Sequence, residues 1–147
     1  MTALREIRVK YHQNKDIHLP NGLKVETPDD VADCFAYMQN EAQEKLVCIS
    51  LSTKNRIMCF EIIGIGTVNT CLAHPREVFR SAILNNAYAI ILVHNHPSGE
   101  PEPSPDDVAL TRIIQQAGNI LGIELLDHII IGDNGRYCSM KALVGIP

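Results

Sequence analysis

Two histidines stand two positions apart at the end of a long apolar run. The run AYAIILV leads into His94 and His96 and predicts a strand covered on both faces. Side chains two apart on a strand point to the same face, with Cα atoms about 6.5 Å apart, so both imidazoles can reach one ion. Asp107 follows eleven residues after His96, at the predicted start of a helix. The intervening loop is stiffened by prolines, which lower the entropy lost when it folds back toward the histidines: Pro97, Pro101, Pro103 and Pro105.

Two imidazoles and one carboxylate form a donor set that suits zinc, with bond lengths of about 2.0 to 2.2 Å. Three protein ligands leave a fourth tetrahedral position for a water, whose pKa falls to about 7 on zinc. Taken singly, Asp107 and Ser104 are explained by helix capping, and His94 by a hydrogen-bonded place in the core. The combination of His94, His96 and Asp107 instead predicts a catalytic zinc site.

A zinc hydrolase also needs a group that takes a proton from water and delivers it to the leaving group. Glu61 is our candidate, because it is the lone carboxylate in the apolar run RIMCFEIIGIG, where an unpaired buried charge would be costly. Glu100 and Glu102 are the alternatives, although acids on an exposed loop need no special explanation. Glu77 and Glu124 are typical of a helix start and a strand edge.

The elements that must position these residues alternate in type along the chain. Period-two alternation and β-rich runs predict strands at 6–12, 45–52, 56–66, 87–94, 123–132 and 136–140. Capping residues, prolines and apolar spacing predict helices from about Pro28 to near Glu41, from His74 to before Asn85, and from Ser104 to near Gly122. A turn is expected at 20–22, and hairpins at 53–55 and 133–135. We therefore expect a mixed α/β or α+β fold in which helices cover a central sheet of mixed direction.

Composition fits one compact domain over residues 1–147. The chain is 46% hydrophobic, which is enough for a single core, and its formal net charge of −4 argues against direct nucleic-acid binding. The basic residues near the amino terminus are interspersed with acids and predict a solvated strand face. We see no signal-peptide segment and no apolar run of the roughly 18 residues that a membrane span needs, so we expect a cytoplasmic protein without membrane contact.

The cysteine pattern, the absence of other motifs and the chain length exclude several other zinc and redox sites. The five cysteines are spread along apolar runs and form no Cys-x-x-Cys pair, so we expect reduced, buried thiols rather than a zinc ribbon or a thioredoxin-like site. Nucleobase deaminases use a His-x-Glu motif and a later Pro-Cys-x-x-Cys motif, which this sequence lacks. Barrel-type amidohydrolases need about 250 residues, so this chain is too short for that fold.

The stretch HNHPSGEPEPSPDD resembles the JAMM (MPN+) metallopeptidase pattern, which is His-x-His-Pro, six residues, Ser, two residues, Asp. Glu61 lies upstream, where the family places its glutamate. The run from about 54 to 137, with GTVN, HPREVFR, AIILVHNHPSG and LLDHIIIG, resembles the RadC-like branch of that family (JAB domain). The resemblance covers well over half of the chain. Its motif core spans about 45–140, and residues 1–44 add an amino-terminal strand and helix to the same domain.

This resemblance implies a curved mixed sheet flanked by helices, in the cytidine-deaminase-like JAB-MPN architecture. It also implies a zinc-dependent peptidase or isopeptidase with His94, His96 and Asp107 as ligands and Glu61 as general acid/base. Ser104 would bind the developing oxyanion or the catalytic water. Two further residues, Asp127 and His128, match a recurrent Asp-His pair of this branch. They either hydrogen-bond a ligand or form a plain polar pair at a strand end.

Two functional hypotheses follow. The first is hydrolysis of an amide bond in a peptide or in a conjugate of a ubiquitin-like protein. The second is a non-catalytic binding module that acts through protein or DNA partners. Longer RadC-like proteins carry a helix-hairpin-helix module that has no counterpart in this sequence, so we do not carry over the family's association with DNA repair. The oligomeric state stays open.

Overall fold

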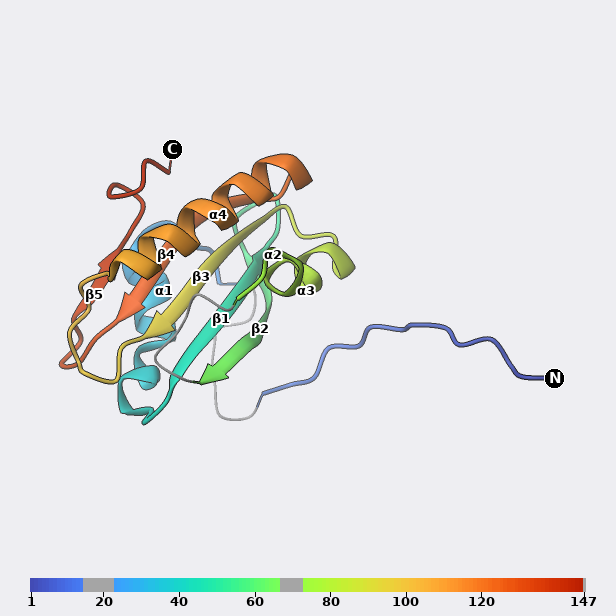
Figure 1. Cartoon of the computed structure of the whole chain (residues 1–147), viewed down its shortest axis with the longest axis horizontal. Coiled ribbons are helices and arrows are strands. Elements are labelled where there is room, and N and C mark those ends of the chain that lie inside the picture. Colours follow the sequence, from blue (N-terminus) through green and yellow to red (C-terminus); the bar gives the residue numbers. More distant parts are fainter. Residues whose placement is uncertain (15–22, 67–72, 147) are drawn as a thin grey trace.

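The computed structural model describes residues 1–14, 23–66 and 73–146. Its centre is a sheet in the order β2-β1-β3-β4-β5 (Figure 1). The strands are β1 (Glu44–Leu51), β2 (Ile57–Gly66), β3 (Ala89–Asn95), β4 (Glu124–Ile131) and β5 (Tyr137–Ser139). Neighbouring strands pair antiparallel except β3 and β4, which are parallel. The predicted mixed sheet and both predicted hairpins are therefore confirmed.

Helices cover both faces of this sheet (Figure 1). One face carries α2 (Pro75–Val78), α3 (Arg80–Leu84) and α4 (Pro105–Leu121), and the other carries α1 (Pro28–Cys34) and the 3₁₀ helix η1 (Ala36–Asn40). The strands divide their side chains between the two layers: Leu92 of β3 packs toward α4, whereas its neighbours Ile91 and Val93 pack toward α1. His94 follows Val93 and so returns to the α4 face, because strand residues alternate between faces.

Local sequence signals define helix α4 at both ends. Ser104 caps its first turn by accepting from the backbone N–H of Asp107, and Pro105 fills the first helical position. Gly122 ends the helix in the left-handed conformation, with φ 71°, which a glycine adopts without a Cβ penalty. Leu110 and Ile114 bury the inner face of the helix against the sheet. The packed helix therefore fixes the position of Asp107 relative to β3.

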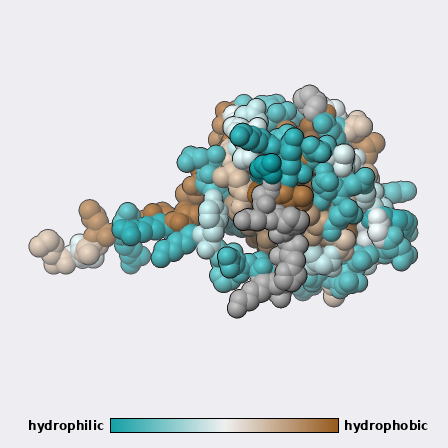
Figure 2. Space-filling view, turned by 180° about the vertical axis from the view of Figure 1, so that it is seen from behind, coloured by the Kyte–Doolittle hydropathy of each residue, from teal (hydrophilic) through white to brown (hydrophobic). Residues whose placement is uncertain are grey.

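The structure corrects three predicted elements. Residues 6–12 form no strand, and the segment 1–14 extends from the body with its side chains exposed (Figures 1 and 2). Its alternating pattern needs a neighbouring strand to become β structure, and none of the described strands pairs with it. The first helix ends at Cys34, where Phe35 leaves helical geometry and packs its ring against Phe60. The second helix is divided into α2 and α3 at Phe79.

The remaining predictions concern thiols, a turn and membranes. Of the four described cysteines, all have free thiols but only Cys48 is fully buried, so the expectation of buried thiols was too broad. The turn predicted at 20–22 and Cys71 lie outside the described residues. Among the described helices, none has the length and apolar character that crossing a bilayer requires.

Candidate metal centre

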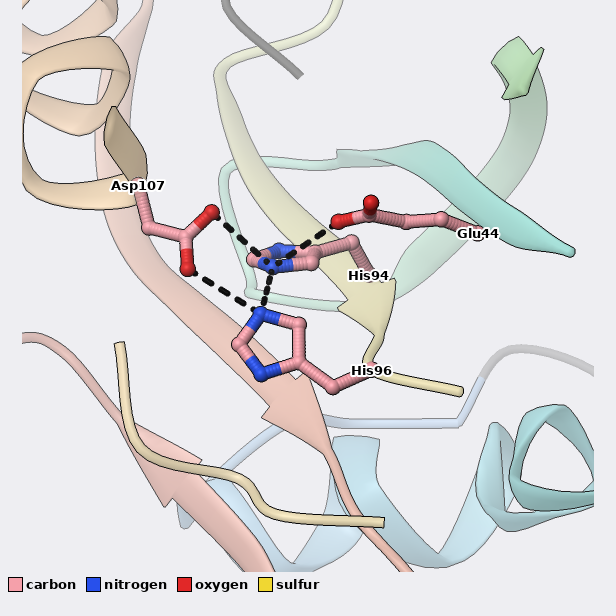
Figure 3. Close-up of side chains that lie close together, drawn as sticks. All are labelled: Glu44, His94, His96 and Asp107. Atoms are coloured by element: carbon pink, nitrogen blue, oxygen red, sulfur yellow. Dashed lines mark hydrogen bonds and ion pairs between the residues drawn. The ribbon is translucent and has the colours of Figure 1, made fainter. Parts of the chain in front are cut away.

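The predicted ligand atoms meet at the carboxyl end of β3. His94 lies in the strand, His96 follows it directly, and Asp107 reaches them from the first turn of α4 (Figure 3). The Nε2 atoms of the two imidazoles are 2.9 Å apart. Asp107 places Oδ1 3.2 Å from Nε2 of His94 and Oδ2 3.0 Å from Nε2 of His96. The loop between the histidines and the helix thus folds back as predicted, and the three side chains point toward one centre.

A fourth residue, Glu44, joins this group from the first position of β1. Leu46 is the register partner of His94, so Glu44, two residues before Leu46, lies at the end of the sheet where β3 finishes. Its Oε1 atom is 3.7 Å from Nε2 of His94 (Figure 3). Each of the four side chains, Glu44, His94, His96 and Asp107, offers a ligand atom, and these atoms all lie within 4.8 Å of one another.

Burial and mutual contact shift the protonation of this cluster. Burial alone would raise the pKa of Asp107, but its contacts with the imidazoles of His94 and His96 outweigh burial and hold that pKa well below its ordinary value. The same bond to Asp107 raises the pKa of His96. Burial raises the pKa of Glu44, although His94 and His96 act in the opposite direction. Protons and a metal ion therefore compete for the Nε2 atoms of this cluster.

The outer nitrogen of each imidazole is engaged on a different element. Nδ1 of His94 lies 2.7 Å from Nε2 of His128 on β4. Full burial penalises the charged form of His128 and lowers its pKa well below the ordinary value. Nδ1 of His96 lies 2.8 Å from the carbonyl oxygen of Glu100, which can only accept, so this Nδ1 carries a proton. Both rings are thereby oriented with Nε2 toward Asp107.

The donor set fits a divalent cation. Two imidazole nitrogens and two carboxylates converge in a cluster whose members His94 and Asp107 are buried and whose members Glu44 and His96 are partly exposed. No lysine or arginine of the described residues forms an ion pair with Asp107 to neutralise it. Such nitrogen and oxygen donors suit zinc, and three close ligands with a more distant carboxylate resemble a catalytic rather than a structural site. The predicted ligand set is thus brought together by the fold.

Sequence comparison assigns the chain to a family. Residues 25–145 match the family described as RadC-like JAB domain. The chain belongs to this family. A UPF0758 protein of Methanosarcina acetivorans is 47% identical over 119 residues, which cover 80% of this chain and 52% of that protein. A UPF0758 protein of Bacillus cereus is 43% identical over 141 residues, covering 93% of this chain and 57% of that protein.

A third relative, the UPF0758 protein of Caldanaerobacter subterraneus subsp. tengcongensis, is 50% identical over 118 residues. That match covers 80% of this chain and 50% of the relative. This RadC-like JAB chain therefore spans about half the length of the curated relatives it matches. The name UPF0758 states no activity, so the family membership gives the domain type and leaves the reaction to be argued from the site.

In this RadC-like JAB domain, the structure does not bring Glu61 to the cluster. Glu61 lies on the edge strand β2, where its register partner on β1 is Cys48, four residues beyond Glu44. Its carboxylate binds Arg80 of α3 at the surface. The expectation that Glu61 is a costly, unpaired buried charge was wrong, because β2 is an edge strand with partly exposed side chains. Glu61 instead lines a groove of about 790 Å³ between β2, α3 and residues 9–14.

The other candidates lie near the cluster without joining it. Ser104 caps α4 beside Asp107, and its backbone N–H donates to Oδ2 of that ligand. Glu100 contributes its carbonyl oxygen rather than its carboxylate, which pairs with Arg136. Asp127 accepts from backbone N–H groups and from Ser139, so its side chain does not reach His94. Of the predicted Asp-His pair, only His128 hydrogen-bonds a ligand candidate.

Sequence reasoning missed Glu44 because it did not pair β1 with β3. An antiparallel pairing of these two apolar runs places the start of the first beside the end of the second. Glu44 is the carboxylate at that start, so the register Leu46↔His94 would have identified it. Thr111, whose hydroxyl lies 2.6 Å from Nδ1 of His128, was also missed, because a threonine one helical turn after Asp107 carries no distinguishing pattern in the sequence.

Proposed function

We propose that this chain is a zinc-dependent hydrolase that cleaves an amide bond. The observation that carries the proposal is the convergence of His94, His96 and Asp107 beside a fourth, more distant carboxylate, Glu44. A purely structural metal site would instead enclose the ion with four close protein ligands. Zinc bound at these atoms would supply a Lewis acid that polarises a carbonyl and acidifies a water molecule.

We assign the general acid/base role to Glu44 in place of Glu61. Glu44 is close enough to the cluster to accept a proton from an attacking water, and its position at the start of β1 leaves its side chain partly accessible. The same carboxyl group then delivers the proton to the leaving nitrogen, which amide cleavage requires. Glu61 lies on β2 opposite Cys48, away from the cluster, and its carboxylate pairs with Arg80.

Ser104 and the helix start supply a second contact to the substrate. The Ser104 hydroxyl accepts from the N–H of Asp107 and retains its own O–H for donation. A donor held beside the metal ligands stabilises the negative charge that develops on the carbonyl oxygen during attack. We propose that the substrate is a peptide or a conjugate of a ubiquitin-like protein, since these present the amide bonds that this chemistry cleaves.

Replacing one carboxylate oxygen by an amide nitrogen in each of the two glutamates tests this assignment. We expect Glu44→Gln to retain zinc and lose at least about 100-fold in turnover of peptide and conjugate substrates, as for loss of a general acid/base. Glu61→Gln is the matched control on the neighbouring strand and should keep both zinc and turnover. Zinc binding without any turnover sensitive to Glu44 would contradict the enzymatic proposal. It would favour a binding module that acts through protein or DNA partners.

A further inference from the structure

A buried series of hydrogen bonds connects two of the ligand candidates by a route away from the metal-facing atoms. Nδ1 of His94 lies 2.7 Å from Nε2 of His128, and Nδ1 of His128 lies 2.6 Å from the hydroxyl of Thr111. That hydroxyl donates to the backbone carbonyl of Asp107 at 2.7 Å. The series joins β3, β4 and α4, and His128 and Thr111 are completely buried.

The chemistry of these groups fixes the direction of every bond in the series. A carbonyl oxygen only accepts, so the single hydroxyl proton of Thr111 goes to Asp107. The sulfur of Met140, at 3.7 Å, is a weak and distant competitor for that proton. Nδ1 of His128 must then donate to the hydroxyl oxygen. A buried, neutral imidazole has one N–H, so Nε2 of His128 accepts from Nδ1 of His94.

We infer that Thr111 and His128 are positioning residues that fix the tautomer of His94. The carboxylate of Asp107, 3.2 Å from Nε2 of His94, favours the proton on that atom. Thr111 and His128 instead hold the proton on Nδ1, so that Nε2 presents a lone pair to the metal centre. The inference rests on the proposed metal site and deepens it. Metal-ligating histidines usually donate their outer N–H to a carboxylate, a carbonyl or water. Here the acceptor is a neutral imidazole, and its own orientation depends on a threonine that contacts no metal-facing atom.

Burial makes this dependence strict. His94 is 1% exposed and both positioning residues are 0% exposed, so water cannot take over a lost hydrogen bond without opening the core. The neighbouring carboxylate of Asp127 is engaged with Ser139 and with backbone N–H groups and offers no alternative acceptor. Removing the Thr111 hydroxyl therefore frees His128 to carry its proton on Nε2. The proton of His94 then moves to its own Nε2, the atom that faces the metal.

Two substitutions at position 111 separate this role from packing. Thr111→Val keeps the shape and removes the hydroxyl, whereas Thr111→Ser keeps the hydroxyl and removes a methyl group. The readouts are the zinc dissociation constant, from competition with a chelator, and ¹⁵N NMR of the His94 ring in metal-free and zinc-loaded protein. Ser50→Ala removes a fully buried hydroxyl on a different element, β1, and is the control for the loss of a buried polar group. Thermal unfolding without zinc verifies that each variant is folded.

We expect Thr111→Val to weaken zinc binding about 10-fold or more and, in the metal-free protein, to move the His94 proton from Nδ1 to Nε2. Thr111→Ser and Ser50→Ala should retain the affinity and the ring signals of the unmodified chain. Equal zinc affinity and unchanged His94 signals in folded Thr111→Val would overturn the positioning role alone. An unmodified chain that binds no zinc would overturn the proposed function, and the positioning role with it.

Discussion

The two imidazoles of the metal centre are held in different ways. His94 is supported from within the core, where its ring lies against His128 with the centroids 4.7 Å apart and its side chain is 2% exposed. His96 is supported at the surface by the carbonyl of Glu100, and its side chain is 16% exposed. The loop that provides this carbonyl is held by Arg136, which contacts Glu100, Asp133 and the carbonyl of Gly99.

This difference separates two ways of building a site. The support of His94 comes from two other elements, α4 and β4, which the hydrophobic core packs together with β3. The support of His96 comes from a residue four positions away and from surface ion pairs. Buried networks lose more when one member is removed, whereas exposed ion pairs contribute little and are screened by salt. The two sides should therefore respond unequally to substitution.

Asp107 contacts both imidazoles, so its loss should have the largest effect. Asp107→Asn keeps the shape of the side chain but removes its charge and half of its acceptor capacity. We expect zinc affinity to fall by more than about 100-fold, beyond the range typical of residues outside the ligand set. Isothermal titration with zinc measures this loss, and an affinity within tenfold of the unmodified chain would show that Asp107 is not a ligand.

His128→Leu should have the next largest effect, because it leaves Nδ1 of His94 and the hydroxyl of Thr111 without their partner in the core. We expect zinc affinity to fall by about 10- to 100-fold. His128→Gln is the matched variant, since its amide oxygen can accept from His94. It should recover part of the loss. Equal zinc affinities for these two variants, measured by chelator competition, would mean that packing rather than hydrogen bonding explains the effect.

Arg136→Gln should have the smallest effect, because its ion pairs with Glu100 and Asp133 are exposed. Such pairs contribute about 0 to 1 kcal/mol, so we expect zinc affinity to change by less than about fivefold. The difference from the unmodified chain should shrink further at 1 M salt, where the Debye length is about 3 Å. Zinc titrations at low and high salt measure this. A salt-independent loss as large as that of His128→Leu would contradict the distinction between the two supports.

Much of this architecture could be predicted from the sequence. The carboxyl end of β3, the capped start of α4 and the hairpins depend on local signals that the sequence carries directly, such as Ser104 before Pro105 and Gly122 at the helix end. His94, His96 and Asp107 could be predicted as a group because two of them share one strand face and the third starts the next helix.

The rest depends on pairing between strands. Glu44 and Glu61 both lie in β-rich runs, and only the order β2-β1-β3 decides which of them is beside His94. Local pattern does not determine that order, so the more apolar surroundings of Glu61 favoured a carboxylate that lies away from His94. Thr111 and His128 acquire their connection only when α4 packs on β4. The segment 6–12 has the alternation of a strand but no partner among the described strands.

Zinc-edge anomalous diffraction from crystals of the zinc-loaded chain tests the central claim most directly. The account predicts one strong peak bonded to Nε2 of His94, Nε2 of His96 and a carboxylate oxygen of Asp107, at about 2.0 to 2.2 Å. Glu44 should lie beyond bonding distance, with a solvent atom completing the coordination. A peak elsewhere, or a fourth bond from Glu44 that closes the coordination sphere, would contradict a catalytic metal centre.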